Sequence, residues 1–147
     1  MISVILTASD DAKALARLLT ALVPAAAEGL VREVAVVGAR GAAAEVAEDC
    51  GADLYDGLGE ALARARGPWI ARAPLAAMLA PDWMELVAEH LRRDPPQAAR
   101  LTARGFSWRA PAGWLVPKAQ TPSVGAAEQD LQRIARLGRR LRVLDRR

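Results

Sequence analysis

The sequence is poor in the residue types on which many functional sites depend. Its 147 residues include one cysteine, Cys50, and one histidine, His90. A single cysteine excludes an internal disulfide and a cysteine-rich metal cluster, and such scarcity is typical of a reducing compartment. Aromatic residues make up only 4% of the chain, so a core of alanine, leucine and valine must pack around the four tryptophans.

Long hydrophobic runs are also absent. No stretch approaches the roughly 20 apolar residues of a membrane-spanning helix, and the opening run of residues 2–6 is too short for a signal peptide. We therefore expect a cytoplasmic protein. With 52% hydrophobic residues, the chain is long enough for one domain with a sizeable core, which we expect to span residues 1–147.

The net charge of +3 comes from the C-terminus, where residues 133–147 include seven arginines. Such a block can meet phosphates, an anionic membrane face or nucleic acid. No aromatic or glycine-rich RNA-binding motif is interleaved with the charges. The pattern therefore favours the solvated face of a helix, followed by a short strand at residues 141–144, and leaves weak peripheral membrane contact as an alternative.

Apolar runs alternate with helical stripes through the first half of the chain. Residues 2–6 are typical of a strand buried on both faces of a parallel sheet, and further strands are predicted at 32–38, 53–57 and 69–73. This order predicts an α/β fold, with a Rossmann-like, mostly parallel sheet flanked by helices.

Turn and capping residues delimit the helices between these strands. Ser9, Asp10 and Asp11 are candidate N-caps of the first helix, and Pro24 followed by Gly29 should end it. Gly51 should close the second helix. Pro81 suits the first turn of a later helix. Four residues are expected on the buried face of that helix: Trp83, Leu86, Val87 and Leu91.

A boundary between two sub-structures is predicted at Pro95 and Pro96, which divides the chain into residues 1–94 and 95–147. The pattern weakens after this point. Residues 100–110 are compatible with a strand and turn, residues 113–119 with a strand, and residues 126–138 with a final helix.

Ligands of an open parallel sheet bind beyond the carboxyl ends of its strands, where helix N-termini face outward. Three segments of this chain occupy such positions. Thr7, Ser9 and Asp10 are suited to hydrogen-bonding a base or ribose, whereas Gly38 and Arg40 can approach a phosphate. The third segment offers Arg72. An alternative interpretation is purely structural: the glycine ends a strand, and the aspartate caps a helix.

Five segments together resemble family 2 glycosyltransferases. "ISVILTASDDAKALARLL" is similar to the strand and turn that open the nucleotide-sugar site of that family, and "VREVAVVGARGAAAEVAEDCGADLYDG" to its second unit. "ALARARGPWIARAPLAAMLAPDWMELV" resembles the third unit, and "GWLVPKA" and "AEQDLQRIARLGRRLRVL" resemble the later strand and helix. The resemblance implies a GT-A fold, truncated in its C-terminal part, and a nucleotide sugar as partner.

The chain departs from this family at the positions that hold the metal. The family carries an acidic motif for Mg²⁺ or Mn²⁺, whose positions match residues 74–76, and its ligand position matches Ala76. No Asp or Glu occurs from Ala61 to Pro81, and Gly38 stands where the family has a nucleotide-contacting Asp. We therefore expect no metal cofactor. Arg40 or Arg72 can supply positive charge to a diphosphate instead.

The catalytic base that the resemblance implies matches Glu128, whose alternative role is that of an acid favoured at a helix N-terminus. The segment between Leu101 and Gly113 lacks the stretch that would build an acceptor pocket. His90 is interpreted as a boundary residue at the edge of a buried helix face.

Three hypotheses follow. The preferred one is a transferase-like protein without metal-dependent catalysis that retains nucleotide or partner binding. The second is an active, metal-independent transferase that uses Arg40, Arg72 and Glu128. The third is an interaction module that presents the basic C-terminal helix. So reduced a fold is also expected to pair with another copy of itself.

Overall fold

The computed structural model describes residues 1–8, 11–72, 78–79, 81–103, 113–121 and 139–145, and for residues 78–79, 102–103 and 139–145 it describes the backbone alone. Several predictions fall outside this part of the chain. They concern Ser9, Asp10, residues 74–76 with Ala76, and Glu128 within the predicted helix at 126–138.

Eight strands of the described residues form one mixed sheet, in the spatial order β3-β2-β1-β4-β7-β6-β8-β5. The strands are β1 (Ile2–Thr7), β2 (Val31–Val37), β3 (Asp53–Tyr55), β4 (Trp69–Arg72), β5 (Met78–Leu79), β6 (Ala99–Ala103), β7 (Gly113–Pro117) and β8 (Arg139–Asp145). The pairs β1/β2, β1/β4, β2/β3 and β6/β8 are parallel. Strand β7 is antiparallel to β4 and β6, and β5 is antiparallel to β8. The predicted α/β architecture is confirmed.

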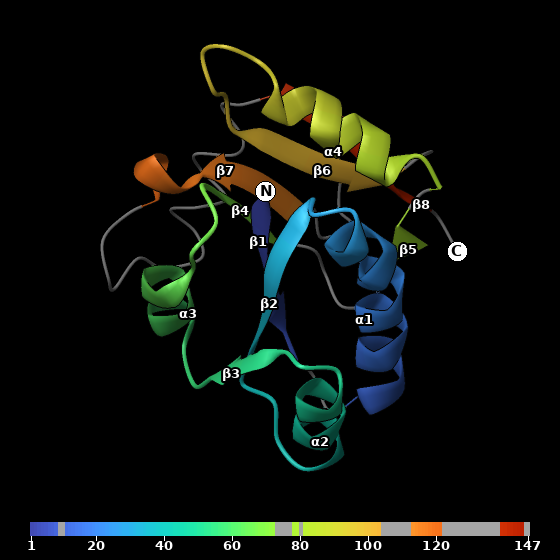
Figure 1. Cartoon of the computed structure of the whole chain (residues 1–147). Helices are drawn as coiled ribbons and strands as arrows, with labels where there is room; N and C mark the ends of the chain where they lie inside the picture. Colours follow the sequence, from blue (N-terminus) through green and yellow to red (C-terminus); the bar gives the residue numbers. More distant parts are fainter. Residues whose placement is uncertain (9–10, 73–77, 80, 104–112, 122–138, 146–147) are drawn as a thin grey trace.

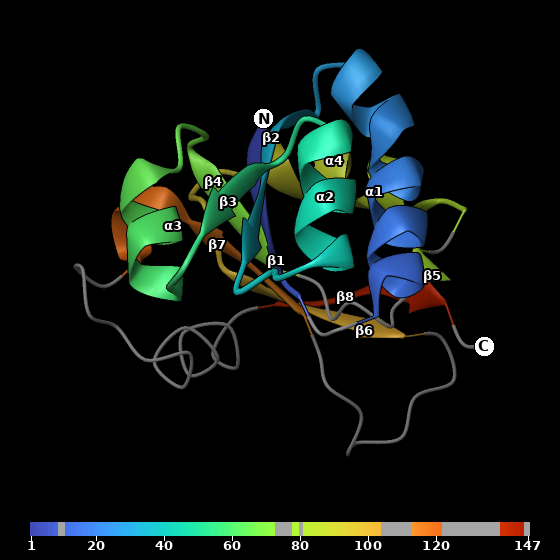
Figure 2. The ribbon, with the colours of Figure 1, turned by 90° about the horizontal axis from the view of Figure 1, so that it is seen from below.

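Helices cover both faces of this sheet (Figures 1 and 2). They are α1 (Ala12–Ala27), α2 (Ala42–Asp49), α3 (Leu58–Arg64) and α4 (Trp83–Leu91), and a 3-10 turn follows β7 at Lys118–Gln120. Helices α1, α2 and α4 contribute to one buried cluster, whereas α3 packs against the opposite face. Within the described residues, no helix has the length and apolar character needed to cross a membrane.

Pro24 lies inside α1, so the prediction that it ends the helix is wrong. Proline removes one backbone donor, but its own carbonyl still accepts a hydrogen bond, here from Glu28 N at 3.0 Å. Burial of Leu22 and Ala25 on either side keeps this last turn against the sheet. Gly29, with a φ of +76°, follows the helix end as predicted.

Helix α4 is anchored more deeply than its apolar residues alone predict. Trp83 and Val87 are buried as expected, but Leu86 and Leu91 are only partly buried. His90 is not a boundary residue: it is 1% exposed, and its Nε2 lies 2.7 Å from Gln97 O. Because a carbonyl can only accept, Nε2 carries the proton in this contact. This hydrogen bond makes burial of the imidazole tolerable.

A polar cluster around the buried Ser3 joins the amino ends of β1, β2 and β4. Ser3 Oγ donates to Glu33 Oε1 at 2.5 Å and accepts from Gly67 N at 2.8 Å. The Glu33 carboxylate also accepts from Arg66 N at 2.5 Å and from Arg66 Nε. Since Arg66 and Gly67 lie just before β4, this cluster fixes where β4 starts relative to β1 and β2.

Candidate functional site

The order of the parallel strands creates a switch point between β1 and β4. From β1 the chain proceeds to β2 and β3 on one side and then returns to place β4 on the other side of β1. Crevices that bind ligands in open α/β sheets lie at such points, beyond the carboxyl ends of the strands. In Figure 2 the strands β1 to β4 run downward from the N-terminus, so their carboxyl ends lie at the bottom of the sheet.

Thr7 and Arg72 flank the switch point. Arg72 is the last residue of β4 and pairs in register with Ile5 of β1. Side chains alternate along a strand, so Thr7 lies on the same face as Ile5, two residues closer to the carboxyl edge. Thr7 is exposed and Arg72 is half-buried. A hydroxyl and a guanidinium thus stand on adjacent strands, at one face and one edge.

The same face continues into a row of three side chains. Trp114 of β7 pairs with Arg72 on one side and with Arg100 of β6 on the other. Residues directly opposite each other in antiparallel strands have Cβ atoms about 5 Å apart on one face. Trp114 is 1% exposed and packs with Ile5 and Ile70. Two arginines therefore stand on either side of a buried indole, next to the switch point.

Gly38 and Arg40 follow β2 at the same edge. Gly38 has a φ of +75°, and its backbone N donates to Tyr55 O at 2.9 Å. Arg40 does not reach toward β1. Its guanidinium donates to Asp56 Oδ1 at 2.7 Å, and the two side chains are 72% and 83% exposed. An exposed pair of this kind contributes little stability, so an anionic ligand can replace the carboxylate.

The sequence thus located four residues that the fold brings to one edge, Thr7, Gly38, Arg40 and Arg72. It did not predict Trp114 and Arg100, which form a row with Arg72, or Asp56, which forms an ion pair with Arg40. Trp114 and Arg100 could be found only from the register in which β7 pairs with β4 and β6. The position of Asp56, immediately after β3, is a signal that the carboxyl-end rule could have used.

The described residues at this edge do not by themselves provide a ligand set for a divalent cation. Mg²⁺ and Mn²⁺ require several oxygen ligands, above all carboxylates. Strand β4 ends in a cationic residue, and the Asp56 carboxylate at this edge is paired with Arg40. Across the described residues, no group of three or more His, Cys, Asp or Glu side chains is placed to hold a metal ion.

Solved structures of one enzyme share the fold of this chain. No model of a protein family and no curated protein sequence matches the chain. Glucosyl-3-phosphoglycerate synthase from Mycobacterium tuberculosis, in complex with phosphoglyceric acid, matches with a TM-score of 0.68 at 17% identity, over 99% of this chain and 70% of that one. Its complex with Mn²⁺, uridine diphosphate and glucosyl-3-phosphoglycerate matches with a TM-score of 0.67 at 17% identity, over 100% and 72%. This chain has the GT-A fold.

A further complex of that enzyme, with Mn²⁺, uridine diphosphate and phosphoglyceric acid, matches with a TM-score of 0.56 at 23% identity, over 71% of this chain and 44% of that one. The chain thus spans between 44% and 72% of the length of these structures. At such identities the likeness concerns the GT-A fold, and the chemistry must be argued from the residues of this chain.

Proposed function

We propose that this chain is a glycosyltransferase-like protein that binds a nucleoside diphosphate or its sugar conjugate and is impaired in metal-dependent transfer. The observation that carries the proposal is the switch point, flanked by Thr7 on β1 and Arg72 on β4. The enzyme of the same fold was solved with uridine diphosphate and with uridine-diphosphate-glucose, which supports this choice of ligand class.

Arginine chemistry supports binding without a metal. A diphosphate needs compensation of its negative charge, and a guanidinium provides it through paired hydrogen bonds to phosphate oxygens. Arg72 stands at the switch point, and Arg100 lies across Trp114 from it. Glycosyl transfer further requires stabilisation of the departing diphosphate, for which the family uses a divalent cation. The absence of any acid from residue 61 to residue 81 therefore argues for impaired catalysis.

Calorimetric titration with UDP, GDP and their common sugar conjugates, with and without Mn²⁺, tests the proposal. We expect at least one of these ligands to bind, with an affinity that Mn²⁺ does not change, and no transfer or hydrolysis of the sugar. Absence of binding to every ligand would refute the nucleotide site. Binding that requires Mn²⁺, or turnover of a nucleotide sugar, would refute the proposed impairment and favour an active transferase.

Substitutions of Arg40 and of Asp56 should change the affinity for the nucleoside diphosphate in opposite directions. Arg40→Ala should weaken binding of the nucleoside diphosphate by about tenfold, since a charge-assisted hydrogen bond to phosphate is lost. Asp56→Asn should strengthen binding, because it releases the guanidinium from the ion pair at 2.7 Å. Arg17→Ala, an exposed change on α1, is the control. If both variants at the pair bind as the wild type does, Arg40 does not contact the phosphates.

A further inference from the structure

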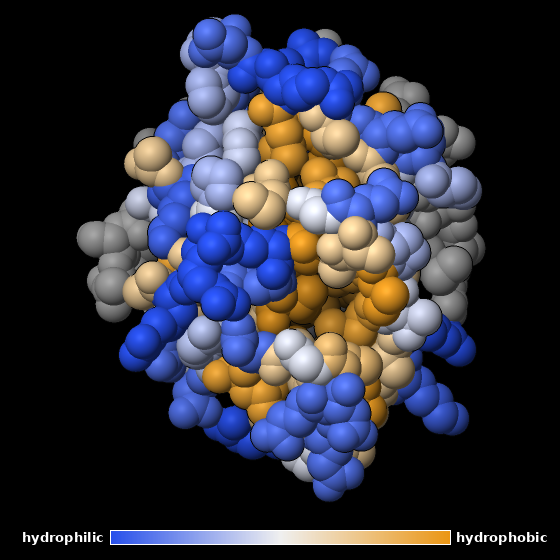
Figure 3. Space-filling view, viewed as in Figure 1, coloured by the Kyte–Doolittle hydropathy of each residue, from blue (hydrophilic) through white to orange (hydrophobic). Residues whose placement is uncertain are grey.

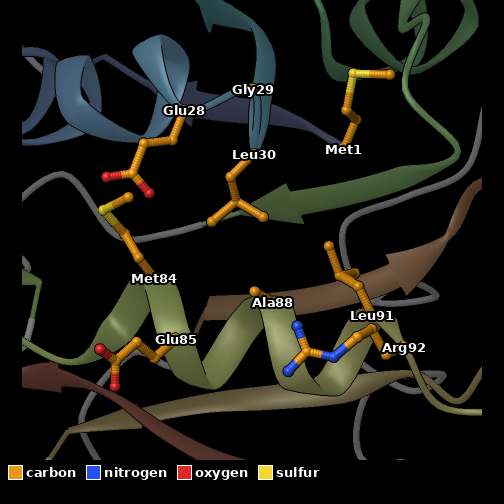
Figure 4. Close-up of a pocket in the computed structure, with 9 residues that line it drawn as sticks. All are labelled: Met1, Glu28, Gly29, Leu30, Met84, Glu85, Ala88, Leu91 and Arg92. Atoms are coloured by element: carbon orange, nitrogen blue, oxygen red, sulfur yellow. The ribbon is translucent and has the colours of Figure 1, made fainter.

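A groove opens at the opposite edge of the sheet from the nucleotide site. It has a volume of about 410 Å³ and lies between the end of α1 and helix α4, beside the amino end of β1. Figure 4 shows Met1 and Leu30 on one side of it and α4 on the other. In Figure 3, which has the orientation of Figure 1, apolar surface lies below α4 in the upper part of the view; the larger apolar hollow at the centre, over α1 and β2, is a separate pocket. Met1 is 54% exposed here.

Helix α4 presents two different faces. Trp83, Val87 and His90 are buried against the rest of the protein. Met84, Ala88 and Leu91 line the groove instead, at the spacing that places side chains on one side of a helix. Ala88, the smallest of the three, lies at the middle of this face, so another helix can approach closely there.

Charges of opposite sign mark the two ends of the groove. Glu28 and Glu85 lie at one end and Arg92 at the other (Figure 4). Within the described part of the chain, these three side chains make no hydrogen bond or ion pair, whereas Glu89 and Arg93 of the same helix pair at 3.1 Å. Arg92 follows Glu85 by seven positions, or about 10 Å along the helix axis.

We propose that a second copy of this chain docks in the groove, with the two α4 helices antiparallel about a two-fold axis close to Ala88. A two-fold axis brings each surface against itself in reversed direction. The acidic end of one groove then faces the basic end of the other, and Glu85 lies opposite the partner's Arg92 on both sides of the axis. The apolar stripe of each α4 is covered by the other. An antiparallel second copy therefore pairs the charges at both ends of the groove and also covers its apolar surface.

Charge reversal tests this arrangement, with sedimentation equilibrium of the full chain as the measurement. The wild type should be a dimer. E85R places two arginines of one chain opposite two arginines of the other, and R92E places four glutamates together. Each should raise the dimer dissociation constant by about tenfold or more, because two like-charge pairs replace two attractive ones.

The complementary combinations should restore association. In an equimolar mixture of E85R and R92E, each interface pair is again Arg with Glu, so a heterodimer should form, and the double variant E85R/R92E should form a homodimer. Glu48→Arg on α2 carries the same charge change outside the groove and should remain a dimer. Circular dichroism of each variant controls for folding. A monomeric wild type would overturn the proposal, as would single variants that still dimerise or a mixture that does not.

Discussion

Replacing Gly67 by alanine should destabilise the protein by about 3 kcal/mol, at the upper end of the usual cost of overpacking. A Cβ at this position would stand 2.7 Å from both Ser3 N and Ser3 Oγ and 3.1 Å from Ile2 C. Two of these atoms belong to the backbone of β1, so no rotation of a side chain relieves the contact. The start of β4 must move away from β1, and the hydrogen bond from Gly67 N to Ser3 Oγ is lost with it.

Urea denaturation measures the effect, and Gly57→Ala provides the matched control. Gly57 precedes α3 with extended backbone, and a Cβ there would have no atom within 4 Å. That variant should lose less than about 1 kcal/mol, the cost of alanine at a helix N-cap. Equal stabilities of the two variants would mean that β4 adapts to the added methyl group. Because the same shift displaces Arg72, Gly67→Ala should also bind the nucleoside diphosphate more weakly.

The elements that the sequence predicted correctly are those encoded by neighbouring residues. The apolar run of residues 2–6 became β1, and Gly51, with a φ of +72°, closes α2 as expected. Pro24 shows the limit of such rules. A local preference against proline in helices was outweighed by burial of Leu22 and Ala25, and burial depends on what lies across the core.

His90 illustrates the same limit for a polar side chain. Its spacing from Trp83 and Val87 places it on the buried face of α4, but an imidazole there needs a partner. That partner is Gln97 O, in the connection that follows the helix. Helical periodicity alone could not supply it.

The sequence allowed only part of the candidate site to be predicted, because some of its residues come together through strand pairing that no local pattern encodes. Its edge follows from the rule for parallel strands, which needs only the strand order and led to Thr7, Gly38 and Arg72. The row beside it requires the register of β7 between β4 and β6, where Trp114 meets both arginines. Trp114 lies 42 positions after Arg72 and 14 after Arg100, and antiparallel pairing of this kind leaves no periodic signal in the sequence. Residues contributed by such pairings were therefore missed.

Replacing Glu33 by glutamine should remove a component of stability that depends on pH. Burial raises the pKa of this carboxyl, but hydrogen bonds from Ser3 and Arg66, with the charge of Arg66, outweigh burial and hold the pKa below its ordinary value of 4.5. The folded state therefore favours the carboxylate. This contribution is fully present above pH 4.5 and is lost as the pH falls through the lowered pKa of the folded protein.

The free energy of unfolding at pH 7 and near pH 3, from urea denaturation, measures this contribution. At pH 7, Glu33→Gln should cost about 2 kcal/mol, because an amide nitrogen cannot accept the hydrogen bond from Arg66 Nε and the charge is lost. The difference from the wild type should shrink toward pH 3. Glu48→Gln, an exposed change on α2, is the control and should leave the free energy of unfolding close to that of the wild type. A Glu33→Gln difference that stays constant with pH would show that the carboxylate is not preferentially stabilised by folding.

Since Glu33 holds Arg66 and Ser3 holds Gly67, the ionised cluster keeps β4 in place at neutral pH, and with it the edge that carries Arg72.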